Sequence, residues 1–234
     1  MLMTILVVVV VSAALIAGAL WGIYGKISGK TEGFVIALAG GALVVSLVSE
    51  MIQPAIAQSN LWVGLGSVAA GAVVFSVVDF WIDEKWGPEG GGGLLAAITL
   101  DGVPENLALG VALIGAAPIE VTALAGAIML SNLPEAAGGA KQMVGNGLSK
   151  GKTLGLWTLT ALILSAAAII GYFALDGVSP HVLAATRCFA AGAVVASLAT
   201  EVFPKAYKED HHMAGIATAI GVILAVLLGQ LALA

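Results

Sequence analysis

The chain has 234 residues, of which 60% are hydrophobic and only 10% are charged, and its mean hydropathy is +1.06. A soluble domain carries about 25% charged residues, so this composition argues against a soluble protein and favours one that lies in a lipid bilayer. The formal charge of −5 argues against nucleic-acid binding. A single cysteine, Cys188, excludes an intramolecular disulfide and a cysteine-cluster metal site.

Apolar stretches of about 20 residues, the length that crosses the hydrocarbon core, recur along the whole sequence. We therefore predict eight transmembrane helices and no soluble domain, with residues 1–234 forming a single transmembrane domain. No positive charge precedes the first stretch, which is also too long for the apolar part of a signal peptide, so we expect it to remain as a helix. The predicted spans lie at about 4–24, 33–56, 61–82, 93–116, 118–144, 153–175, 182–206 and 213–232.

The basic residues predict how these spans are oriented. All eight lysines lie in or beside alternate links between the spans, whereas Arg187 lies toward the other side. The positive-inside rule then places the lysine-rich links in the cytoplasm and both termini outside, in the plasma membrane. Trp157 and other tryptophans fall near span ends, where we expect them to act as interfacial anchors.

Two pairs of segments repeat each other. Residues 41–50, GALVVSLVSE, align with residues 192–201, GAVVASLATE, and residues 99–110, TLDGVPENLALG, align with residues 129–140, MLSNLPEAAGGA. The members of each pair cross the membrane in opposite directions, as the inverted repeats of secondary transporters do. We therefore expect an all-α integral membrane protein in a 3+2+3 arrangement, with helices 1–3 at about 4–82, a central pair 4–5 at about 93–144 and helices 6–8 at about 153–232.

Carboxylates are predicted at membrane depth, where no lysine or arginine is predicted to neutralise them. Such a group costs about 2.5–3.5 kcal/mol on the insertion scale and usually faces a functional cavity. It is tolerated there by protonation, by hydration or by a bound cation. The five carboxylates are Glu50, Asp101, Glu105, Glu135 and Glu201.

Local spacing favours the bound cation. Asp101 and Glu105 lie four residues apart and share a helix face, and Ser131 and Glu135 repeat this spacing. The proline before each glutamate lacks an N–H group and frees a backbone carbonyl one turn earlier. Ser131 and Asn132 fit interhelical hydrogen bonding equally well. We predict a site for one or two divalent cations with Asp101, Glu105, Asn106, Ser131, Asn132 and Glu135 in the ligand set, and with Glu50 and Glu201 completing it.

An eight-helix chain with Pro-Glu motifs on its fourth and fifth helices resembles the ZIP (Zrt/Irt-like protein) family of divalent metal transporters. The usual family motif, His-Asn-x-Pro-Glu-Gly, corresponds here to residues 101–106, DGVPEN, and 131–136, SNLPEA, so this chain resembles a divergent member that lacks both motif histidines. The resemblance implies a binuclear metal site between helices four and five and a homodimer. It also implies that Glu105 and Glu135 are shared, bridging ligands and that Glu201 belongs to the second metal.

The missing histidines bear on which metal is carried. The resemblance implies zinc or iron, whereas a set of oxygen ligands shifts the expectation toward manganese, and zinc also accepts carboxylates. We expect a transporter of zinc, manganese or iron, not an enzyme, with no prosthetic group and with the metal ion, the lipid bilayer and a second copy as its partners.

Two other functions remain open. One is a proton-coupled organic-solute carrier that uses the same carboxylates as relay groups. The other is an intramembrane lipid-phosphate hydrolase, which needs a cationic clamp on the phosphate. The chain offers only one arginine, Arg187, and no lysine at the predicted membrane depth.

Overall fold

The computed structural model describes residues 2–86, 91–115 and 121–232. Within these ranges all regular structure is helical, so the predicted all-α fold is confirmed for the described part of the chain. The elements are α1 (Leu2–Tyr24), α2 (Gly29–Ser46), η1 (Leu47–Ile52), α3 (Gln53–Gln58), α4 (Leu61–Trp86), α5 (Gly91–Ala112), α6 (Thr122–Gly145), α7 (Lys150–Leu175), α8 (Pro180–Ser197), η3 (Leu198–Val202), α9 (Phe203–Glu209) and α10 (Ala214–Ala232).

Two of the predicted spans contain a widened turn. The π-helical segment η1 joins α2 to α3, and η3 joins α8 to α9, so each trio forms one continuous helical rod. Counted in this way, the described elements form eight rods that fit the eight predicted spans. Ser28, Ser149 and Ser179 begin three of these rods, and in each case the serine side chain accepts a hydrogen bond from the backbone N–H three residues later.

Several helices have the length and composition needed to cross a membrane. In the described residues five segments meet this criterion, namely Ile5–Tyr24, Gly29–Gln58, Leu61–Trp81, Lys150–Leu175 and Pro180–Glu209, and Ala214–Gln230 is a shorter apolar helix. The helices α5 and α6 are not among these segments: α6 is less hydrophobic than the five, and several side chains of α5 lie outside the described residues. Large apolar side chains are exposed along α1, α4, α7 and α10, which is the surface expected of a membrane protein.

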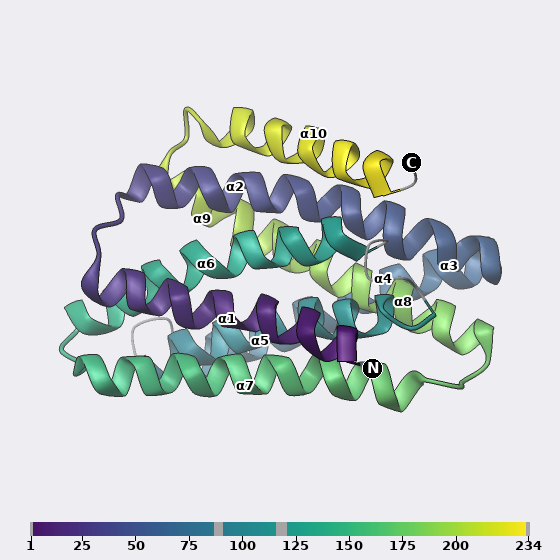
Figure 1. Ribbon diagram of the computed structural model, residues 1–234, viewed down its shortest axis with the longest axis horizontal. Coiled ribbons are helices and arrows are strands. Elements are labelled where there is room, and N and C mark those ends of the chain that lie inside the picture. The colour runs from purple at the N-terminus through teal and green to yellow at the C-terminus, as the bar shows by residue number, and fades with distance from the viewer. Residues whose placement is uncertain (1, 87–90, 116–120, 233–234) are drawn as a thin grey trace.

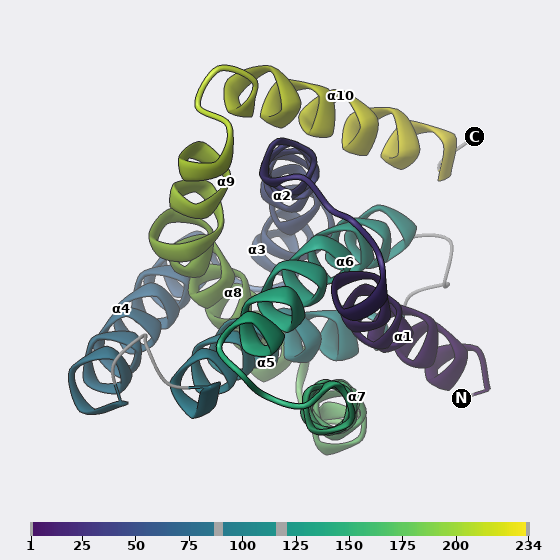
Figure 2. The same ribbon diagram turned by 90° about the vertical axis from the view of Figure 1, so that its left-hand side faces the viewer.

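The rods run roughly along the long axis of the molecule, and the labels N and C lie at the same end (Figure 1). Seen end-on, α2, α5, α6 and α8 occupy the middle, while α1, α4, α7 and α10 lie around them (Figure 2). Each outer helix packs on an inner one: α1 on α6, α7 on α5, α4 on α8, and α10 on α2. The helices α5 and α6, which carry the Pro-Glu motifs, are therefore packed inside a ring of apolar helices.

Glycines allow the helices of these pairs to approach closely, and one pair from each half of the chain illustrates this. A Cβ atom at Gly41 on α2 would overlap the carbonyl of Thr218 on α10, and a Cβ atom at Gly192 on α8 would overlap the carbonyl of Val68 on α4. Small residues of this kind let membrane helices pack backbone against backbone. The same mode of contact thus joins an outer helix to an inner one in both halves of the chain.

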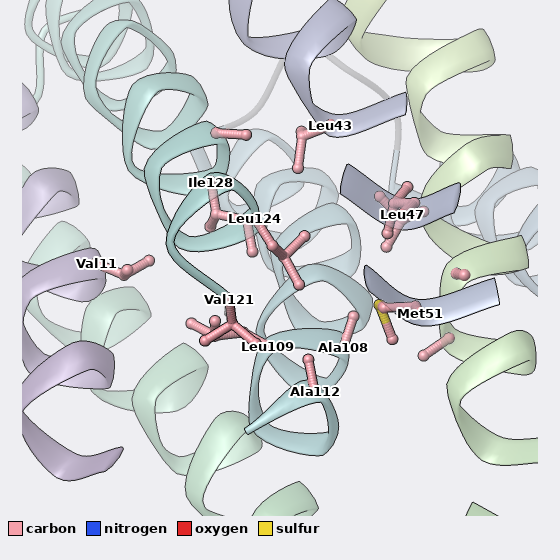
Figure 3. Close-up of a cluster of buried hydrophobic side chains, with 14 of the residues drawn as sticks. Val11, Leu43, Leu47, Met51, Ala108, Leu109, Ala112, Val121, Leu124 and Ile128 are labelled. Atoms are coloured by element: carbon pink, nitrogen blue, oxygen red, sulfur yellow. The ribbon is translucent and has the colours of Figure 1, made fainter. Parts of the chain in front are cut away.

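The middle of the bundle is filled by apolar side chains from α2, η1, α5, α6, α8 and η3 (Figure 3). We call Leu43, Leu47, Leu109, Leu124, Ile128, Val194 and Leu198 the central apolar cluster, and all seven are fully or almost fully buried. A second cluster between α1, α6 and α7 contains Leu15 and Trp157. Trp157 is completely buried, so its predicted role as an interfacial anchor is wrong: helix packing covers its ring.

Candidate cation site between helices α5 and α6

Helix α5 carries the first Pro-Glu motif into the interior. Glu105 is only 4% exposed and its neighbour Asn106 is fully buried. The Asn106 side-chain nitrogen donates to the carbonyl of Gly102 at 2.9 Å, and its Oδ1 atom has no hydrogen-bond partner among the described residues. A buried carbonyl oxygen without a donor is costly, and it is also a ligand of the type that hard cations accept.

Helix α6 carries the second motif opposite the first. Glu135 lies close enough to Glu105 for the two carboxylates to repel each other. Ser131 and Asn132 are buried beside it. The Ser131 hydroxyl donates to the carbonyl of Ile128 at 3.0 Å in the same helix, while Asn132 Nδ2 has no hydrogen-bond partner in the described part of the chain. The structure thus places the Glu105 and Glu135 carboxylates within electrostatic range of each other, with Asn106 and Asn132 buried on the same two helices.

Glu135 and Ser131 also line a cavity of about 880 Å³ at the end of the bundle that carries the lysines. We call it the lysine-side cavity. Its wall includes Glu201 from η3 together with Glu32 and Lys205. Three residues of the predicted site, Ser131, Glu135 and Glu201, therefore line one cavity, which is open at the lysine end of the molecule.

Glu50 lies elsewhere. Its carboxylate accepts a hydrogen bond from the backbone N–H of Leu124, in the first turn of α6, at 3.3 Å. It lines a second cavity of about 630 Å³, which we call the Arg187 cavity and which lies toward the end that carries the chain termini. The structure therefore places Glu50 and Glu135, which sequence analysis assigned to one site, in different cavities.

The central apolar cluster separates the two cavities. Along α6 the order is Thr122 in the Arg187 cavity, Leu124 and Ile128 in the cluster, and Ser131 and Glu135 in the lysine-side cavity. The rods that contain α2 and α8 pass through the same three regions. The Glu135 side of the candidate site is therefore accessible from the lysine end, and fully buried hydrocarbon lies between it and the other end.

The prediction that no basic residue lies at the depth of the carboxylates is wrong, because Arg187 lies there. Its side chain is buried and lines the same cavity as Glu50. The guanidinium group donates to the carbonyl of Ile114 at 2.7 Å and to that of Val111 at 3.4 Å. These carbonyls lie at the C-terminal end of α5, where the helix dipole favours a positive charge, which explains how a buried arginine is tolerated.

Glu32 and Lys205 were missed by the sequence analysis. Glu32 is buried and forms an ion pair with Lys205 at 3.3 Å. Its carboxylate lies against Gly138 of α6, where a Cβ atom would overlap it. Because the predicted span began at residue 33, Glu32 looked like part of a solvated link; only the packing of α2 on α6 reveals that it is enclosed.

Asp101 lies on α5 one turn before Glu105, but its side chain lies outside the part of the chain that the structure describes. Among the described residues no group of three or more histidine, cysteine, aspartate or glutamate side chains is arranged to hold a metal ion. The described donors are therefore the Glu105 and Glu135 carboxylates and the neighbouring amides. Two acidic groups with amide oxygens can attract a divalent cation without enclosing it tightly.

Comparison with known proteins found no family model that matches this sequence and no similar sequence among curated proteins.

Proposed function

We propose that the protein transports divalent cations across the membrane through a site between α5 and α6. The observation that carries this proposal is the approach of Glu105 and Glu135, two carboxylates from different helices, inside a bundle with an apolar surface. Two like charges in a buried site repel each other, and a divalent cation between them would neutralise both. A permanent structural site would need more ligands than the described ones, whereas a transported ion must also leave.

The chemistry of the site favours manganese over zinc and iron. Glu105, Glu135 and the unpartnered Asn106 oxygen are all oxygen donors, and such donors suit manganese. Zinc and iron remain acceptable cargo because both bind carboxylates. The resemblance to the ZIP family rests on the same two Pro-Glu motifs and agrees with this class of cargo.

An alternating-access mechanism is supported by the packing of the helices. The contacts of α1 on α6 and of α4 on α8 have counterparts in those of α7 on α5 and of α10 on α2. The π-helical turns that carry Glu50 and Glu201 also fall at matching places in the two aligned repeats. These pairs are what a 3+2+3 arrangement with inverted repeats requires. In such a transporter, a shift of one half against the other opens the site to one side at a time.

The lysine-side cavity would then face the cytoplasm, because the lysines cluster at its end. Both termini would lie outside, and the plasma membrane and a homodimer would complete the assignment. The protein would act as a transporter and not as an enzyme. In the structure as it stands, the Glu135 side of the site is open toward the lysine end.

One observation favours a second candidate, a proton-coupled carrier of small organic solutes. The Arg187 cavity has the volume of a small-molecule site and contains both a buried guanidinium and Glu50. Arg187 is engaged by backbone carbonyls, however, which leaves less of it for a solute. Uptake that survives chelation of divalent metals would favour this candidate.

The experiment is uptake of Mn²⁺, Zn²⁺ and Fe²⁺ into liposomes that contain the purified protein, compared with the variant Glu105→Gln. The matched control is Glu209→Gln, which removes the same charge at the rim of the lysine-side cavity. We expect Glu105→Gln to abolish uptake while the control retains it, with both variants folded by size-exclusion chromatography. Normal cation uptake by folded Glu105→Gln would refute the proposal.

A further inference from the structure

The lysine-side cavity contains a cation of the protein itself. Lys205 pairs with Glu32 at 3.3 Å, and its ammonium group also attracts the carboxylate of Glu135 through space. All three side chains line the same cavity. The candidate cation site and a basic side chain therefore face one another across a common space.

The Glu32 end of this arrangement is rigid. Glu32 lies in the first turn of α2, where the helix dipole stabilises a negative charge. Its carboxylate is buried against Gly138, at a point where even a methyl group would not fit. A carboxylate fixed in this way can hold an ammonium group as an ion-pair partner, and it cannot itself move toward the cation site.

The Lys205 end can move. The lysine side chain is 39% exposed and consists of a flexible four-carbon stem with a compact charge. Lys141 lines the same cavity, but its ammonium group donates to the carbonyl of Ile27 at 3.2 Å. Lys205 is thus paired with the buried carboxylate of Glu32 and attracted by the carboxylate of Glu135.

We propose that Lys205 is a tethered counter-ion of the cation site: its ammonium group exchanges between Glu32 and Glu135 and competes there with the transported cation. This inference rests on the proposed function. When a divalent cation leaves Glu135, the ammonium group replaces part of its charge, so that Glu105 and Glu135 do not face each other uncompensated. When a cation arrives, Glu32 holds the displaced ammonium group.

The first test is the affinity of the purified protein for Mn²⁺, measured by titration in detergent at low ionic strength. Lys205→Gln removes the competing charge, so we expect Mn²⁺ to bind about tenfold more tightly, and the difference to shrink as salt is added. Lys205→Arg keeps the charge and should stay within about threefold of wild type. Lys208→Gln, a control at another lysine that lines the same cavity, should change the affinity by less than about twofold.

A double-mutant cycle tests whether Glu32 holds the Lys205 ammonium group or binds the metal ion itself. Glu32→Gln frees Lys205 to compete, so we expect it to weaken Mn²⁺ binding several-fold in the wild-type background. In the Lys205→Gln background the same substitution should have no effect, because Glu32 then has no ammonium group to hold. An equal loss of affinity in both backgrounds would show that Glu32 binds the metal directly and would overturn the inference.

The outcomes also separate this inference from the proposed function. Mn²⁺ binding by the wild type that is lost in Glu105→Gln supports the site. If the site is supported but Lys205→Gln behaves like Lys208→Gln, the counter-ion role alone is refuted. If the wild type binds none of Mn²⁺, Zn²⁺ and Fe²⁺, the proposed function fails and this inference fails with it.

Discussion

The central apolar cluster offers the sharpest test of how the two cavities are kept apart. Leu124 is completely buried, and in α6 it lies between the residues that line the Arg187 cavity and those that line the lysine-side cavity. Leu124→Ala removes three carbon atoms from this barrier. The space left behind exceeds the roughly 10–15 Å³ that one water molecule needs, and the adjoining Arg187 cavity can supply the water.

The cost of the substitution follows from its burial. A fully buried leucine replaced by alanine typically destabilises a protein by about 2–5 kcal/mol, and by less where water or neighbouring groups fill the cavity. Leu15 provides a matched control, since it is also completely buried but lies in the second cluster, between α1, α6 and α7. We therefore expect Leu15→Ala to be destabilised at least as much as Leu124→Ala.

The two variants should differ in function. In liposomes with an internal cation-sensing dye, Leu124→Ala should show a passive cation or proton leak that does not saturate, because water then connects the two cavities. Leu15→Ala should keep the wild-type rate of saturable uptake, corrected for folded protein. Equal leak from both variants, or none from Leu124→Ala despite a lowered thermal midpoint, would refute the view that this cluster is the barrier.

Three further outcomes can be measured with the same preparations. Arg187→Met removes the guanidinium donor from the carbonyls of Val111 and Ile114, of which Val111 keeps the Ile114 N–H. The free energy of unfolding should fall by about 1–3 kcal/mol, which thermal unfolding in detergent reports. An unchanged midpoint would show that this cap contributes nothing. Gly138→Ala should displace the Glu32 carboxylate and lower the uptake rate. Gly145→Ala, at a glycine with open space beside the same cavity, should leave the uptake rate unchanged. Equal uptake rates in the two variants would argue against a fixed position for the Glu32 carboxylate. Competition titrations should give a higher ratio of Mn²⁺ affinity to Zn²⁺ affinity than a site with histidine ligands has. A strong preference for Zn²⁺ would mean that ligands other than these oxygens dominate the site.

The positions of the helices were predictable from the sequence because a membrane span needs about 20 apolar residues whatever its neighbours are. Burial within the bundle was not predictable in the same way. Trp157 follows a lysine-rich link and looks interfacial by its place in the chain, yet its ring is enclosed between helices. Glu32 looks like a link residue, yet the packing of α2 on α6, which puts its carboxylate against Gly138, buries it.

The candidate site was predictable in part for a related reason. The spacing of the Pro-Glu motifs places Glu105 and Glu135 at matching positions of two helices, and the structure brings them together. The spacing says nothing about the hydrocarbon that lies between Glu50 and Glu135. Nor does it indicate that Arg187 donates hydrogen bonds to carbonyls at the end of α5, because that contact joins residues more than 70 positions apart.

Arg187 and Lys205, basic residues that line the two cavities, are not repeated in the aligned segments. Extending the alignment of the aligned segments places Ile36 opposite Arg187 and Pro54 opposite Lys205, so neither basic residue has a basic counterpart. Arg187 is held by backbone carbonyls, whereas Lys205 is half-exposed and paired with one side chain. The fixed guanidinium group of Arg187 cannot move to the place that a transported ion leaves, but the mobile ammonium group of Lys205 can. If Lys205 exchanges as proposed, the charge of the departing cargo is compensated only on the lysine side, and this one side chain gives transport a preferred direction.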